Sequence, residues 1–87
     1  MGIKNLSQLK KYLANEGVTI KLTYSYYAGH KYLNIPRKVI KYQTNGVQFE
    51  GGSWLMFDKA DKYVFSENCF SFLDEGRVFL TYEYIKE

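Results

Sequence analysis

The side chains best suited to bind a ligand are basic and aromatic and lie close together in this sequence. The stretch from residue 27 to residue 41 contains two tyrosines, a histidine, an arginine and three lysines: Tyr27, His30, Lys31, Tyr32, Arg37, Lys38 and Lys41. Aromatic rings stack on bases or fill a pocket of a partner protein, and Lys and Arg contact phosphates or carboxylates. We therefore expect these seven residues to form a binding surface. The competing interpretation is that the lysines only cover a solvated face of the fold.

Such a surface suits two classes of ligand. A protein partner held by aromatic and arginine anchors is the preferred expectation, and a single-stranded nucleic acid is the first alternative. Tyr27 and Tyr32 flank a loop that contains a glycine, so we expect both rings to be exposed. Tyr24 and Tyr26 instead continue an apolar alternation that begins at Val18, which predicts that they lie in the core.

Residues that usually carry out catalysis are scarce in this chain. It has one histidine and one cysteine, and it lacks both the glycine-rich phosphate-binding loops and the nucleophile elbow of common enzymes. We predict no enzyme activity, no catalytic residue and no cofactor. The second alternative function, a small nuclease-like toxin, would use His30 as a general base with Lys31 and Arg37 around a phosphate.

Four other residues with possible ligand chemistry are predicted to have structural roles. Cys69 lies in an apolar segment and is expected to be an inert core residue. Asp58 and Asp61 share a turn, where carboxylates usually face solvent, so we predict no metal site there. Trp54 alternates with Met56, which favours a core position for its ring.

The length and composition predict one small folded domain covering residues 1–87. Hydrophobic residues make up 46% of the chain and aromatic residues 18%, which is enough for a modest core and too apolar for a disordered chain. No stretch approaches the roughly 18 apolar residues of a membrane span, and the first residues have no apolar signal region. A lone thiol fits a reducing compartment. We expect a cytoplasmic protein without a membrane partner; homo-oligomerisation stays open.

The net charge of +3 divides unevenly along the chain. Residues 1–49 carry eight Lys or Arg against one acid, and residues 50–87 carry four against eight acids, so the balances are +7 and −4. This asymmetry indicates either a basic face for an acidic partner or charges that neutralise one another once the halves fold together. We favour the second interpretation, because strands from both halves must share one small sheet.

The first secondary-structure element is predicted to be a helix from Asn5 to Glu16. Asn5 can cap its N-terminus, leucines follow at helical spacing, and Gly17 can end it in a left-handed conformation. After Gly17 the apolar period changes to two, which predicts a half-buried strand. Pro36 then removes a backbone donor, so it is expected at an edge, a bulge or a break between strands.

Residues 37–50 are predicted to form a hairpin. Asn45-Gly46 is a favoured pair for a two-residue type I′ turn. Counting outward from that turn places Lys41 opposite Glu50. The same register puts a set of apolar or uncharged side chains on one face: Ile40, Tyr42, Thr44, Val47 and Phe49.

The rest of the chain is predicted to be short strands joined by turns. A bend at residues 51–52 precedes a strand over 53–57, a turn or single helical turn over 58–61 and a strand over 63–65. A second hairpin pairs residues 69–73 with 78–85 across a turn at 74–77. The fold class is therefore α+β: one N-terminal helix packed on an antiparallel β-meander of five to seven strands, with partial closure into a small barrel as a further possibility.

One segment carries a resemblance to known proteins. Residues 37–55, with the sequence RKVIKYQTNGVQFEGGSWL, resemble small orphan accessory proteins of phages and prophages of low-GC Gram-positive bacteria. The preceding helix and the usage of Lys, Tyr and Asn extend this likeness over most of the chain. No catalytic motif defines the group, so no functional residue carries over. The resemblance implies a protein that binds a host or phage macromolecule rather than one that catalyses a reaction.

Overall fold

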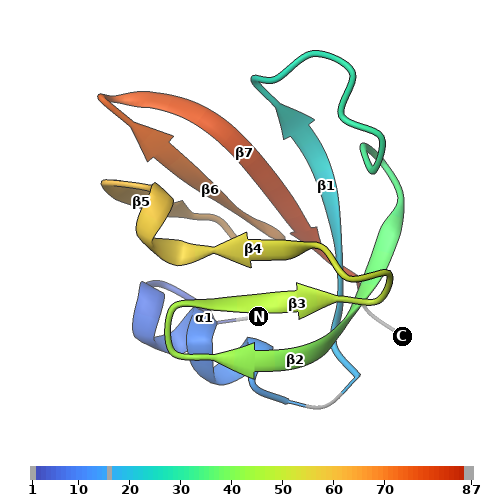
Figure 1. The fold of residues 1–87 in the computed structure, drawn as a ribbon. Helices are drawn as coiled ribbons and strands as arrows, with labels where there is room; N and C mark the ends of the chain where they lie inside the picture. Colours follow the sequence, from blue (N-terminus) through green and yellow to red (C-terminus); the bar gives the residue numbers. More distant parts are fainter. Residues whose placement is uncertain (1, 16, 86–87) are drawn as a thin grey trace.

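A computed structural model describes residues 2–15 and 17–85 and shows one helix and seven antiparallel strands in one sheet (Figure 1). The elements are α1 (Leu6–Leu13), β1 (Thr19–Ser25), β2 (Pro36–Gln43), β3 (Gly46–Phe49), β4 (Trp54–Met56), the 3₁₀ turn η1 (Phe57–Lys59), β5 (Lys62–Phe65), β6 (Cys69–Asp74) and β7 (Arg77–Tyr84). The strand order is β4-β3-β2-β1-β7-β6-β5. This confirms the predicted α+β meander.

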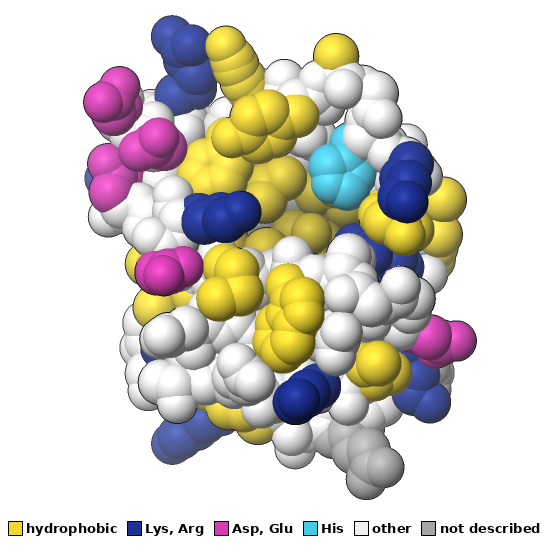
Figure 2. All heavy atoms as spheres, viewed as in Figure 1, with side chains coloured by type: hydrophobic (Ala, Val, Ile, Leu, Met, Phe, Trp, Pro, Cys, Tyr) yellow, Lys and Arg dark blue, Asp and Glu magenta, His cyan; other side chains and the backbone are white. Residues whose placement is uncertain are grey.

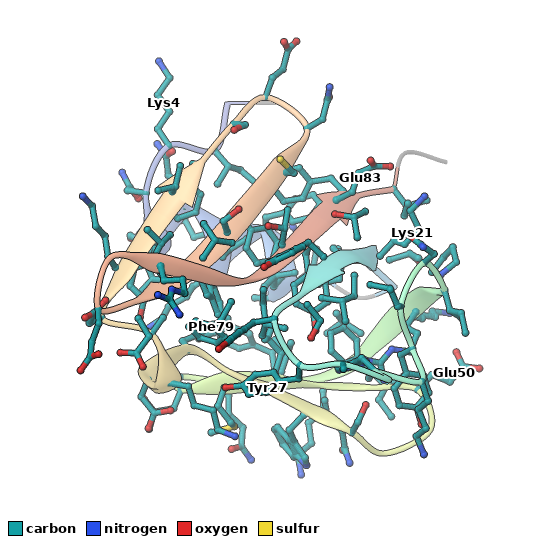
Figure 3. All side chains as sticks on the ribbon, turned by 90° about the horizontal axis from the view of Figure 1, so that it is seen from above. Lys4, Lys21, Tyr27, Glu50, Phe79 and Glu83 are labelled. Carbon is teal, nitrogen blue, oxygen red and sulfur yellow. The ribbon has the colours of Figure 1, made fainter. Side chains whose placement is uncertain are left out.

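The sheet consists of two consecutive meanders joined by the pairing of β1 with β7. A salt bridge of 3.7 Å between Lys21 and Glu83 spans this central pair, and Figure 3 shows both side chains on their neighbouring strands. The strands β4 and β5 are the two ends of the sheet. No pairing joins them in the described part of the chain, so the predicted partial closure into a barrel is not confirmed.

The helix α1 begins where the sequence predicts. The Asn5 side chain accepts a hydrogen bond of 2.9 Å from the Gln8 amide, which satisfies one of the free donors of the first turn. Leu9 and Leu13 are fully buried, so the helix is docked on the core. The helix ends earlier than predicted, because the Asn15 side-chain amide donates to the last-turn carbonyls of Lys11 and Tyr12. Glu16, its predicted end, lies outside the described residues.

A bulge in β1 contradicts the prediction that Tyr24 and Tyr26 are core residues. Leu22 faces Tyr82 across the β1–β7 pair, but Tyr24 faces Thr81, so Thr23 is an extra residue in β1. The extra residue reverses the alternation of the strand beyond it. Ile20 and Leu22 are therefore buried as predicted, whereas Tyr24 is 47% exposed and Tyr26 is exposed as well.

The β2–β3 hairpin forms, but the predicted register is wrong. Gln43 pairs with Gly46, so the two-residue turn is Thr44-Asn45, one residue earlier than predicted, and neither of its residues has a positive φ. Gly46 is buried in β3 instead. A Cβ at this position would lie 2.6 Å from the Leu55 carbonyl oxygen, so glycine is needed here for the close approach of β4.

The changed register also changes which side of β2 is buried. Val39 is buried and Ile40 is 56% exposed, whereas Val47 and Phe49 of β3 are buried, so the set of side chains predicted to share one face is divided between the two faces. A bulge between Val39 and Lys41 accompanies this change. Lys41 consequently pairs with Gln48, and the predicted Lys41–Glu50 pair does not form.

The β6–β7 hairpin confirms the prediction for its turn. Asp74 pairs with Arg77 across Glu75 and Gly76, whose φ angles are +52° and +77°. Two consecutive positive φ angles are what a type I′ turn requires. The type I′ turn that we predicted at Asn45-Gly46 is therefore found at Glu75-Gly76, in the second hairpin.

Two further core predictions need correction. In β4 it is Leu55 that is buried, so the alternating Trp54 ring is exposed rather than in the core. Cys69 is half-buried at the start of β6, where β6 begins to pair with β7, and is not a core residue.

Candidate ligand-binding cleft

The cleft lies where the sheet divides. β1 pairs with β2 only from Thr19 to Lys21, although it stays paired with β7 as far as Ser25. The last β1–β2 pair includes Pro36, which has no N–H to donate. Beyond this pair one backbone hydrogen bond, from Asn34 to the Leu22 carbonyl, still joins the β1–β2 loop to β1. A cleft of about 720 Å³ opens between the two meanders, and Figure 2 shows hydrophobic side chains around the hollow above β4.

The base of the cleft is built around Arg37, the second residue of β2. Its side chain is only 9% exposed. The guanidinium carbon lies 3.8 Å from the centre of the Tyr32 ring and 4.2 Å from that of Phe49, so aromatic rings cover both faces of the group. One guanidinium nitrogen donates a hydrogen bond to the Ser53 hydroxyl. Arg37 thus connects the β1–β2 loop, β3 and the β3–β4 connection.

The charge of Arg37 has no carboxylate beside it in the described residues. The one ion pair found there joins two other residues, Lys21 and Glu83. The phenol of Tyr82, on β7, lies next to the guanidinium. Burial raises the pKa of Tyr82, and the charge of Arg37 and its hydrogen bond act in the opposite direction. The cleft therefore has a positive base that its own neutral side chains solvate.

The walls of the cleft are aromatic and come from distant parts of the chain. Tyr27 is 64% exposed, and Tyr26 and Trp54 are exposed as well. Figure 3 labels Tyr27, on the β1–β2 loop, and Phe79 of β7, and both residues line the cleft. Large exposed rings around a concave surface are typical of binding sites for other molecules.

The charges at the rim have both signs. Lys31, Lys59 and Arg77 line the cleft together with Asp74 and Glu75 of the β6–β7 turn. Lys31 lies 5.0 Å from the centre of the Tyr32 ring, and Arg77 lies 5.8 Å from that of Tyr26. These contacts cover part of the aromatic surface with cations. The rim is therefore a mixed surface and not a continuous basic track.

The structure brings five of the seven predicted site residues together. Those that line the cleft are Tyr27, His30, Lys31, Tyr32 and Arg37. Lys38 and Lys41 line a smaller depression of about 370 Å³ beside the end of α1, although the Lys41 amine also lies 6.0 Å from the centre of the Trp54 ring, which lines the cleft. Because Arg37 points into the cleft and Lys38 is the next residue of the same strand, their side chains lie on opposite faces of β2.

His30 has a local structural role in the loop. Its Nδ1 atom accepts a hydrogen bond of 3.3 Å from the Tyr32 amide, and its ring lies 6.2 Å from the Tyr32 ring. These contacts orient Tyr32 over Arg37. A general base in a nuclease would need a ring nitrogen directed at a nucleophile; Nδ1 is engaged by the backbone, so only Nε2 is left for such a contact.

Sequence reasoning missed the residues that the cleft takes from the second half of the chain. They are Ser53, Trp54, Leu55, Met56, Lys59, Asp74, Glu75, Arg77, Phe79, Leu80 and Tyr82. One signal was present: Arg37 alternates with Val39, so a buried Val39 implies that Arg37 faces the same side. The other lining residues are brought there by the β1–β7 pairing and the turns, which no local pattern encodes.

Comparisons with known proteins give no relative for this chain: no family model matches it, and neither a curated protein nor a solved structure shows significant similarity. In the described residues, no three of the His, Cys, Asp and Glu side chains are grouped so that they could hold a metal ion. No helix described by the structure has the length and apolar character needed to cross a membrane.

Proposed function

We propose that this protein is a non-enzymatic binding module whose cleft holds a segment of a protein partner. In line with the resemblance of residues 37–55, the chain would be an accessory protein of phage origin that acts in the cytoplasm on a host or phage protein. The observation that supports this proposal is the cleft, where exposed rings, a buried cation and rim charges of both signs come together from both halves of the chain.

Three properties of the cleft support a protein ligand. Tyr, Trp and Arg are the residues that most often anchor protein interfaces, and all three types line it. Its exposed rings offer apolar area that a partner can bury. Its rim mixes Lys31, Lys59 and Arg77 with Asp74 and Glu75, which fits the mixed charges of a polypeptide.

Single-stranded nucleic acid is the second candidate, and the exposed rings of Tyr26 and Tyr27 favour it. Bases stack on such rings, and Lys31 and Arg77 could contact phosphates. Lys38 lies on the opposite face of β2, beside α1, whereas the Lys41 amine lies 6.0 Å from the centre of the Trp54 ring at the edge of the cleft. The acidic β6–β7 turn at the rim is unfavourable for a polyanion, which is why this candidate is second.

Selection from a library of displayed peptides tests the proposed function. Binders recovered on the wild-type protein are synthesised, and their dissociation constants are measured by fluorescence polarisation. We expect Tyr27→Ala and Trp54→Ala each to weaken binding by about 30-fold, the effect of losing an aromatic anchor. Tyr24→Ala is the matched control, because Tyr24 is an exposed tyrosine that does not line the cleft.

The nucleic-acid candidate is tested with a fifteen-base oligothymidine at several salt concentrations. Binding through phosphates would give a steep decrease of log K with log salt, and neutralising Lys31, Lys59 and Arg77 together would flatten it by about 0.7 per lost contact. Selected peptides that bind equally well to the Tyr27, Trp54 and Tyr24 variants would contradict the cleft as the binding surface.

A further inference from the structure

We infer that the ligand is an extended protein segment that lies along the free edge of β4 and places an acidic side chain against Arg37. This inference rests on the proposed function and specifies the chemistry of the partner. Two observations carry it independently: the uncompensated buried charge of Arg37 and the unpaired strand edge that borders the same cleft.

The geometry around Arg37 leaves one direction of approach to a ligand. The rings of Tyr32 and Phe49 cover the two faces of the guanidinium, so a further partner can reach only the N–H groups at its edge. One of these already donates to Ser53, and the Tyr82 hydroxyl lies next to the group and takes another. The remaining edge donors lie in one plane, which is the arrangement that a carboxylate accepts with its two oxygens.

The burial of Arg37 makes an anionic partner energetically favourable. A charge that is nine-tenths buried has lost most of its hydration, and no described carboxylate replaces it. A carboxylate bound there would be paired with a preorganised cation inside an aromatic site. Such pairs are stronger than pairs on an open surface, because solvent screens them less.

The edge of β4 offers hydrogen bonds to the main chain of the same ligand. β4 is the last strand of its meander and pairs only with β3. The Phe49 N–H donates to the Ser53 carbonyl, and the Phe57 N–H donates to the Asn45 carbonyl. These two hydrogen bonds determine which residues of β4 direct their main-chain groups toward β3. Because alternate residues of a strand face opposite neighbours, Trp54 and Met56 direct their backbone N–H and C=O groups away from β3, toward the cleft that they line.

These two features fit together in one binding mode. A segment added to the edge of β4 would bond to the groups of Trp54 and Met56, and alternate side chains of the segment would point toward the base of the cleft. Arg37 lies at that base, next to Ser53, the residue that precedes β4. An Asp or Glu side chain at one alternate position therefore meets the guanidinium.

The rim discriminates between a carboxylate and a phosphate chain. Asp74 and Glu75 line the cleft opposite β4 and would repel the successive phosphates of a nucleic acid. A protein segment can place one acid on Arg37 and neutral or basic side chains near this turn. Charge complementarity thus favours a segment with a single acidic residue flanked by apolar or basic ones.

The test uses the peptides selected on the wild-type protein and changes the ligand rather than the fold. We expect the binders to share an Asp or Glu at one internal position, and its replacement by Asn or Gln to weaken binding by about 10- to 100-fold. In Arg37→Met the acidic peptide and its amide counterpart should bind within threefold of each other. Arg37→Lys, which keeps the charge but not the planar group, should restore part of the difference.

Each result decides the inference. It is overturned if the selected peptides share no acidic position, if the amide peptides bind as well as the acidic ones, or if the common acid is the peptide's terminal carboxylate. Oligothymidine that displaces the peptides and loses affinity in Arg37→Met would also overturn it, in favour of a phosphate. Peptides that depend on Tyr27 and Trp54 but not on an acid would overturn this inference alone and leave the proposed function intact. If Arg37→Met does not fold, the comparison of acidic and amide peptides on the wild type still decides.

Discussion

Two aromatic clusters of this protein share the ring of Tyr82 but differ in what covers them. In the first, Phe70 stacks on Tyr82 with ring centres 5.5 Å apart, and Tyr84 meets Tyr12 of α1 edge to face at 5.2 Å. The helix and the sheet enclose these rings. In the second, the cleft, rings are covered by cations and solvent, and Arg37 takes the place that another ring or a helix would fill.

The difference shows how one residue type serves two purposes in a small chain. Rings under α1 have lost contact with water and stabilise the fold, whereas Tyr26, Tyr27 and Trp54 keep surface that a partner can bury. Tyr82 joins the two clusters: its ring stacks in the core, and its hydroxyl lies beside Arg37. Mutations in the two clusters should therefore separate stability from binding.

The largest effect on stability is expected for Phe70→Ala. This ring is fully buried and contacts Phe72, Tyr82 and Tyr84, so its removal leaves a cavity in the enclosed cluster. We expect a loss of about 3–5 kcal/mol in the free energy of unfolding, measured by chemical denaturation. A loss below about 1 kcal/mol would mean that this cluster does not support the fold.

The contribution of the helix is tested by Leu9→Ala and Leu13→Ala. Both side chains are fully buried between α1 and the sheet, so each change should cost about 2–5 kcal/mol in denaturant unfolding. Lys11→Ala is the control, because Lys11 is exposed on the same helix and should change stability by less than about 0.5 kcal/mol. Equal effects of the three changes would show that the helix is not docked.

A smaller effect of opposite sign is expected for Tyr84→Phe. The Tyr84 hydroxyl is buried and has no hydrogen-bond partner in the described residues. Removing an unsatisfied buried group should leave stability at pH 7 unchanged or raise it by about 1 kcal/mol. Thermal unfolding of both proteins measures this difference, and a clear destabilisation would reveal a partner for the hydroxyl.

The same variant should change the response to alkaline pH. Burial raises the pKa of Tyr84 above its ordinary value of 10.0, so the folded state holds the phenol proton more tightly than the unfolded chain. Stability from this group is complete below pH 10 and decreases as the pH rises toward the higher pKa of the folded state, by at most about 1.4 kcal/mol per pH unit. Denaturation between pH 9 and pH 11 should therefore give a shallower decrease for Tyr84→Phe than for the wild type.

The smallest effect on stability is expected for Tyr27→Ala, in the cleft. Tyr27 is 64% exposed, and its ring contacts that of the neighbouring exposed Tyr26, with ring centres 5.9 Å apart. The free energy of unfolding should change by less than about 0.5 kcal/mol, although binding of selected peptides should weaken by about 30-fold. A large loss of stability would place this ring in the same class as Phe70.

Local signals in the sequence predicted most elements and turns. The cap at Asn5, the glycine of the β6–β7 turn and the break at Pro36 act through neighbouring residues, so their effect can be read from a few positions. The bulge at Thr23 and the register of Gly46 could not be predicted in this way. Both depend on contacts with strands that are distant in the sequence, β7 in one case and β4 in the other.

The sequence likewise predicted only some of the residues of the candidate site. Tyr27, Tyr32 and Arg37 lie within one stretch of sequence and do meet in the cleft. Lys38 was grouped with them by proximity along the chain, yet strand alternation turns it to the opposite face. The burial of the Arg37 side chain could not be predicted from the sequence, because the residues that bury it, Phe49, Ser53 and Tyr82, come from three other parts of the fold.

The bulge at Thr23 has a consequence for how such a cleft can persist in evolution. Deleting the codon for Thr23 would remove the bulge, but Tyr24 would then follow the inward Leu22 directly and would still face outward. The pairing of Tyr24 with Thr81 of β7 sets this direction with or without the extra residue. A lineage could therefore gain or lose the bulge through a single in-frame insertion or deletion and keep both tyrosines on the surface.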